Sequence, residues 1–267
     1  MTVREERSLG VRISLNLFRP AVLGLLAAAS AGSAIAVPLT EEHVDVAMAY
    51  PAATPSGWRL YWNDKDNGQE HAAGDAFARG GPQAQITRPA GIAWDFTGVA
   101  AGQPLFVLPQ SQTPSLPFLG IGAEGVATST FVGPISLWLT AVSGPGAFSL
   151  FQTDAFGAIT PFMASADGIT AADTLDVFAG SHVHYAWSFT QPGTYDLTMV
   201  ASATLPGGSV TASDPATFRF VVVPEPSALA LGVIAACGGL AALRRRRGLL
   251  AAQSPACPPA PRFVFPV

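Results

Sequence analysis

Short runs in which apolar and polar residues alternate recur along the middle of the chain, separated by glycine, proline, serine and aspartate. Val44, Val46 and Met48 alternate with Asp45 and Ala47, and the same period of two returns over residues 135–140. This is the period of a β-strand with one buried face. Helical periodicity is nearly absent from residues 37–223, so the pattern predicts an all-β body.

Roughly seven or more short strands without helices indicate an immunoglobulin-like antiparallel β-sandwich with Greek-key connections, and a barrel is the alternative. The turn at residues 191–193 leads into Tyr195, which is similar to the tyrosine corner of such folds. Residues 64–91 contain few large apolar side chains and are predicted to be a long irregular loop.

Residues 182–189 are predicted to form one strand with two different faces. Alternation assigns four large residues to the core face: Val183, Tyr185, Trp187 and Phe189. The opposite face then carries His182 and His184. Their side chains start roughly 6 to 7 Å apart, a spacing from which both imidazoles can reach one metal ion.

Both ends of the chain have the composition of processing segments. Residues 1–36 begin with the basic residues Arg4, Arg7, Arg12 and Arg19, continue with an apolar run over 21–29 and end in Ala-Ile-Ala. This order predicts a signal peptide cleaved after Ala36, with a retained anchor or a buried helix as the alternative. The body would then be exported.

At the other end, a Pro-Glu-Pro motif precedes an apolar stretch over 227–243 and an arginine cluster. The motif residues are Pro224, Glu225 and Pro226, and the cluster is Arg244, Arg245, Arg246 and Arg247. This order resembles the PEP-CTERM sorting signal, which implies a transmembrane helix and an exosortase-type enzyme that cuts and re-anchors the protein. About 17 apolar residues just span a thin bilayer. A plain membrane anchor is the alternative, and residues 248–267 are predicted to be an unstructured tail, longer than is usual in that family.

Charge and cysteine content narrow the functions open to the body. Between residues 37 and 223 there are five basic and fifteen acidic residues, a net charge near −10, which argues against nucleic acid as a partner and favours cations. Both cysteines, Cys237 and Cys257, lie in the C-terminal segment, so the body has neither a disulfide nor a thiol nucleophile.

Several segments together resemble the choice-of-anchor M domain, a bacterial surface-anchored family. The segments are residues 43–46, 105–110, 118–120 with 124–125, 142–146 with 148, and 180–195. The resemblance covers about residues 43–222. It implies a secreted module joined to one of several anchors, in a family where some members lie beside metal-type transporters and a role in relaying substrate has been proposed. Many members carry histidines in the second strand, where this chain has Tyr61 and Trp62.

A metal site on His182 and His184 needs a further ligand from elsewhere in the fold. His43, Asp45, His71 and Glu124 are the candidates in that order, and zinc is the preferred ion. The alternative is a pair of histidines on an exposed strand face. Asp64, Asp66, Asn67 and Glu70 hint at a calcium loop, but Lys65 and the absence of a closing glutamate favour a solvated acidic loop.

Motifs of common enzymes are absent from the sequence, including G-x-S-x-G, H-E-x-x-H and a phosphate-binding glycine loop. The sequence therefore predicts a non-enzymatic, surface-anchored binding module for a divalent metal or a small ligand. A structural or adhesive surface protein without a small-molecule site is the alternative, and an unrecognised hydrolase is the third possibility. The expected partners are the exosortase-type enzyme, the membrane before processing and a metal ion.

Overall fold

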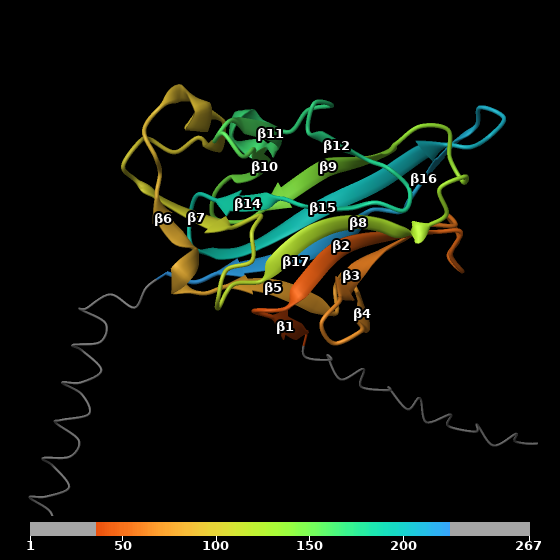
Figure 1. Cartoon of the computed structure of the whole chain (residues 1–267), viewed down its shortest axis with the longest axis horizontal. Helices are drawn as coiled ribbons and strands as arrows, with labels where there is room; N and C mark the ends of the chain where they lie inside the picture. The colour runs from red at the N-terminus through yellow and green to blue at the C-terminus, as the bar shows by residue number, and fades with distance from the viewer. Residues whose placement is uncertain (1–35, 225–267) are drawn as a thin grey trace, which may run out of the picture. The chain divides into compact units, whose positions relative to one another are not determined.

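The computed structural model describes residues 36–224, which form an all-β arrangement of three sheets (Figure 1). The first sheet contains β1 (Val37–Leu39), β5 (Ala76–Gly80), β17 (Ala216–Val222), β15 (Gly193–Thr204), β9 (Ile135–Ser143) and β12 (Thr174–Val177), with β16 (Val210–Ala212) on β15. The second contains β11 (Ile159–Ala164), β10 (Phe148–Thr153), β14 (Ala186–Phe189), β7 (Pro104–Leu108) and β6 (Gln85–Thr87). The third contains β13 (His182–His184), β8 (Phe118–Val126), β2 (His43–Tyr50), β3 (Arg59–Asp64) and β4 (Gln69–Ala72).

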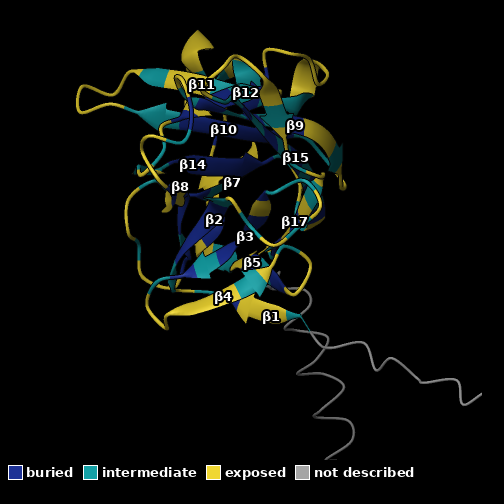
Figure 2. Cartoon of the chain, turned by 90° about the vertical axis from the view of Figure 1, so that its right-hand side faces the viewer, coloured by how far each residue is buried: buried dark blue, intermediate teal, exposed yellow. Residues whose placement is uncertain are grey.

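The three sheets share one hydrophobic core (Figure 2). Phe220 of the first sheet lies with its ring centroid 5.0 Å from Trp187 of the second sheet and 5.5 Å from Trp62 of the third. All three side chains are buried, and buried aromatic rings supply much of the apolar area that stabilises a fold. The observed architecture is consistent with a β-sandwich.

Most strand pairs are antiparallel, as expected, but three are parallel: β1 with β5, β5 with β17, and β2 with β8. The sheets are therefore mixed, which strand-by-strand alternation does not reveal. Helical structure in the described range is limited to the 3-10 turns η1 (Pro82–Ala84), η2 (Ile92–Thr97) and η3 (Ser165–Asp167). None of the helices in residues 36–224 has the length and apolarity to cross a bilayer. Most of the predicted signal peptide and the sorting segment from Glu225 onward lie outside the described residues.

The strand predicted over residues 182–189 is divided between two sheets. β13 pairs with β8 in the third sheet, whereas β14 pairs with β10 and β7 in the second, and Tyr185 stands between them. The prediction of one continuous strand with Val183 in the core is therefore wrong: β13 is an edge strand, and its Val183 is 38% exposed. Trp187 and Phe189 are buried as predicted.

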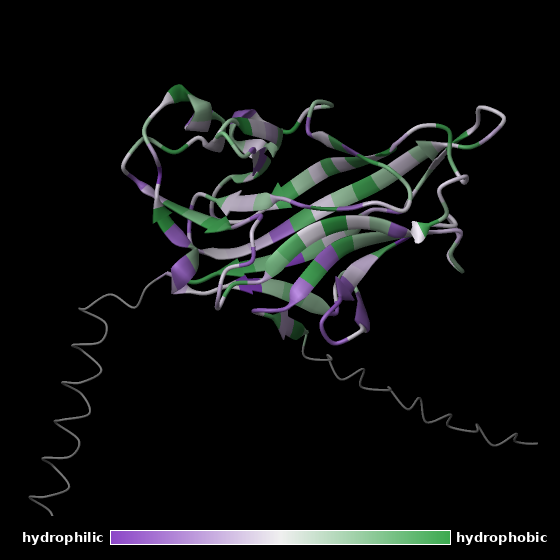
Figure 3. Ribbon diagram, in the orientation of Figure 1, coloured by the Kyte–Doolittle hydropathy of each residue, from purple (hydrophilic) through white to green (hydrophobic). Residues whose placement is uncertain are grey.

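Residues 64–91 are more regular than predicted, since they include β4, β5 and β6. β5 lies between β1 and β17, with Ala76 and Ala78 buried. Small side chains at these positions give no strong apolar alternation, so the strand could not be predicted from the sequence pattern. Figure 3 shows the clearer alternation of apolar and polar residues along strands such as β15.

Tyr195 forms the hydrogen bonds expected of a tyrosine corner. Its hydroxyl donates to the carbonyl of Gln191 at 2.9 Å and accepts from the Gln191 amide at 3.1 Å, and its side chain is fully buried. We expect Tyr195→Phe to lower the free energy of unfolding by about 1 to 3 kcal/mol, because the part-buried backbone amide and carbonyl of Gln191 lose their partner. Urea denaturation measures this. Tyr185→Phe is the control, since the Tyr185 side chain is also buried but its hydroxyl has no hydrogen-bond partner within residues 36–224. An equal loss in both variants would contradict this role of the corner.

Candidate metal centre

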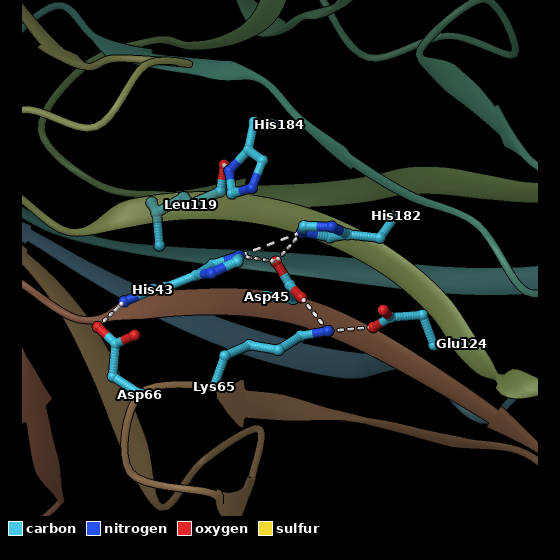
Figure 4. Close-up of polar contacts among 8 residues, drawn as sticks. All are labelled: His43, Asp45, Lys65, Asp66, Leu119, Glu124, His182 and His184. Carbon is cyan, nitrogen blue, oxygen red and sulfur yellow. Dashed lines mark hydrogen bonds and ion pairs between the residues drawn. The ribbon is translucent and has the colours of Figure 1, made fainter.

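Four side chains from two distant parts of the chain converge on one face of the third sheet (Figure 4). His43 and Asp45 come from β2, and His182 and His184 come from β13. One ligand atom from each of the four lies within 4.8 Å of every other. Alternation along β2 places Val44 in the core and turns its two neighbours to this face. The strand period thus supplies two ligands from each strand.

The distances within the group suit a small tetrahedral ion. Nε2 of His182 lies 3.0 Å from Oδ1 of Asp45 and 3.3 Å from Nε2 of His43, and the His43 nitrogen lies 3.8 Å from the same carboxylate oxygen. Zinc bonds of about 2.0 to 2.1 Å at tetrahedral angles place ligand atoms about 3.3 Å apart. These three atoms are therefore spaced as the ligands of one zinc ion are.

Strand β8 runs between the two ligand-bearing strands, and its glycines leave room for them to meet. The register pairs Gly120 with Asp45 on one side and with His184 on the other. A Cβ atom added to Gly120 would overlap Oδ1 of Asp45 and would lie 2.8 Å from Nε2 of His182. The absence of a side chain at Gly120 is what allows Asp45 and His182 to touch across β8.

His184 is held in one orientation by its neighbours. Its ring stacks on Phe118 at a centroid distance of 3.5 Å, and its Nδ1 lies 3.1 Å from the carbonyl oxygen of Leu119. A carbonyl oxygen can only accept, so Nδ1 carries the proton and Nε2 keeps a free lone pair. Backbone support of this kind is typical of metal-binding histidines.

The pKa of His184 is lowered to about 4, chiefly by burial and to a smaller extent by the electrostatic effect of the neighbouring His182 and His43. The imidazole is therefore neutral at pH 7, which is the form that binds a metal. In the unfolded chain the pKa of the same group would be about 6.5.

This pKa difference predicts that the metal-free domain loses stability on acidification. Between about pH 6.5 and 4 the unfolded state binds a proton at His184 that the folded state does not, so the free energy of unfolding falls as the pH falls through this window. His184→Phe keeps a ring beside Phe118 and removes the titration. We expect thermal unfolding in EDTA to show a shallower loss between pH 7 and 5 for this variant. Identical pH profiles would contradict the assignment.

Glu124 is not part of the group of four. It bonds Nζ of Lys65, and Lys65 in turn lies 3.3 Å from Oδ2 of Asp45. Burial alone would lower the pKa of Lys65, but the hydrogen bond with Glu124 and the charge of Asp45 outweigh it and raise the pKa. Glu124 thus touches the group through Lys65. His71 lies on β4, opposite Trp62, and is also outside the group.

The acidic side chains of the loop after β3 make hydrogen bonds within the fold. Asp64 accepts from the backbone and side-chain amides of Asn67, which closes the turn. Asp66 accepts from the backbone amide of His43 at 2.9 Å and so holds the start of β2. The positions of Asp66, Lys65 and Gly120 next to this group were not predicted, because only their partners across the sheet reveal them.

Compared with models of known families, with curated proteins and with solved structures, the chain has no match. The resemblance to the choice-of-anchor M domain and to the PEP-CTERM signal therefore stays a prediction from the quoted motifs.

Proposed function

We propose that the body of this protein is an exported surface module that binds one divalent transition metal, zinc by preference. The observation that carries the proposal is the convergence of four ligand atoms from strands 139 positions apart in the sequence, measured from His43 to His182. Three imidazoles and one carboxylate form a donor set that suits zinc better than calcium or magnesium.

The same donor set favours binding over catalysis. Four protein ligands complete a tetrahedral shell, whereas catalytic zinc sites keep one position for water or substrate. The His43 and His182 side chains are 26% and 22% exposed, so an ion can enter from solvent directly. A structural or adhesive role without a metal remains the alternative function.

Metal analysis of residues 37–223 tests the proposal. The fragment is dialysed against EDTA, exposed to an equimolar mixture of magnesium, calcium, manganese and zinc, and desalted. We expect about one zinc per chain and little of the other metals. Zinc no higher than in the buffer would favour the structural or adhesive alternative.

A small organic ligand is less well supported than a metal. A hollow of about 520 Å³ lies beside Trp94 and Phe151 on the second sheet. Two polar side chains line this hollow, Gln110 and Asp154. The Gln110 amide already forms two hydrogen bonds with the backbone of Thr153, and Oδ1 of Asp154 accepts from two backbone amides. These polar groups are occupied in holding the fold, so we assign the hollow no ligand.

We further propose that the fold is of the immunoglobulin-like type and that the module reaches the cell surface through its terminal segments. The tyrosine corner at Tyr195 supports the first statement. The order of Pro224, Glu225 and Pro226, apolar stretch and arginines supports the second. Mass spectrometry of the mature protein should find no peptide beyond this motif, and recovery of peptides from residues 262–267 at the cell surface would contradict processing there.

A further inference from the structure

Lys65 is aimed at the carboxylate of the candidate metal centre. It follows β3 directly, and its backbone amide donates to the carbonyl of His43 at 2.8 Å, which places it beside β2. From there its side chain crosses the face of the sheet to Asp45 and Glu124 (Figure 4). One ligand of the proposed metal therefore has a fixed cation on its far side.

Asp45 needs a compensating charge when no metal is bound. Its side chain is 0% exposed, and Oδ2 has no hydrogen bond although Lys65 lies within ion-pair distance. Oδ1 has His182 beside it, but a buried carboxylate oxygen without a partner is strongly unfavourable, so the ammonium group near Oδ2 stabilises the metal-free fold. The same ammonium repels a divalent ion on the other side of the carboxylate.

We propose that Lys65 is an internal counter-cation, which neutralises Asp45 in the metal-free protein and lowers the affinity of the site for metal. Glu124 sets the strength of this effect, because its carboxylate offsets part of the lysine charge. This inference rests on the proposed metal-binding function and deepens it: the site is built to release its ion as well as to bind it. Lys65 acts on the metal through Asp45 and is not a ligand.

The experiment compares zinc affinities of four forms of residues 37–223 by competition with a chromophoric chelator. The forms are wild type, Lys65→Met, Glu124→Gln and the double variant. We expect Lys65→Met to bind zinc about tenfold more tightly than wild type and Glu124→Gln to bind it more weakly. The gain should shrink in high salt, since salt screens partly exposed charges.

The double variant separates this proposal from a simpler one, in which Lys65→Met only frees Glu124 to become a ligand. If Lys65 acts by its charge, adding Lys65→Met to Glu124→Gln tightens binding by at least the same factor, because no carboxylate then offsets the lysine. Without tightening in the Glu124→Gln background, the counter-cation role is overturned.

Thermal unfolding gives an independent readout. Metal-free Lys65→Met should unfold at a lower temperature than wild type, and saturating zinc should remove the difference, since the metal then neutralises Asp45. If wild type binds zinc and Lys65→Met binds it equally or more weakly, the proposed role of Lys65 is overturned and the metal-binding function still stands. Absence of zinc binding in all four forms would overturn the proposed function itself.

Discussion

Replacing His182 and His184 together with alanine is expected to abolish zinc binding and to leave the fold intact. Both ligands come from β13, and half of the donor set disappears with them. Four-ligand zinc sites in small domains bind with about 10 to 16 kcal/mol, so two ligands account for an affinity loss of at least about a thousandfold. The fold should persist because β13 is a short edge strand and neither histidine lies in the core.

Zinc titration calorimetry on residues 37–223 measures this loss. His71→Ala is the matched control, since His71 belongs to the same sheet but lies outside the group of four. It should give the same heat and stoichiometry as wild type, while the double histidine variant gives no binding heat. Equal heats from wild type and the double variant would reduce the pair to ordinary surface histidines.

Gly120→Ala is expected to weaken zinc binding by about a hundredfold although every ligand remains. The added methyl group overlaps Oδ1 of Asp45 and crowds Nε2 of His182, so the two ligands can no longer meet across β8. Mutation of residues that orient metal ligands lowers metal affinity by about 10- to 100-fold, and we expect the displaced ligand atoms to have an effect of the same size. The same titration measures the change.

Gly122→Ala is the control for this substitution, because Gly122 is on the same strand and faces the same side. A Cβ atom there would lie 3.5 Å from the carboxylates of Asp45 and Glu124, which is ordinary contact. We expect near wild-type affinity. If Gly120→Ala also binds zinc with wild-type affinity, the space left by the absent side chain of Gly120 has no role in the site.

The sequence predicted the all-β class and the shared face of two candidate ligands because both depend on the period of a strand. His182 and His184 share a face in the structure for that reason. His43, the first choice among the further candidates, lies in the same group. The exchange of sheets at Tyr185 was not predictable, since alternation continues through it and strand pairing is not a local property.

The supporting residues were hidden for a similar reason. In the sequence Lys65 has the features of a loop residue, and only the pairing of β2 with β3 shows that it lies beside Asp45. Gly120 likewise resembles any small residue, and only the folded structure shows that Asp45 and His182 both contact it. Glu124 was a candidate by charge, but in the structure Lys65 lies between its carboxylate and that of Asp45. Long-range pairing of β8 with both β2 and β13 determined each outcome.

The most direct test of the metal centre is anomalous X-ray diffraction at the zinc absorption edge from crystals of residues 37–223 grown with one equivalent of zinc. The predicted result is one strong anomalous peak about 2.0 to 2.3 Å from ligand atoms of His43, Asp45, His182 and His184. A crystal with zinc bound elsewhere, or with no anomalous peak among these four side chains, would contradict the account.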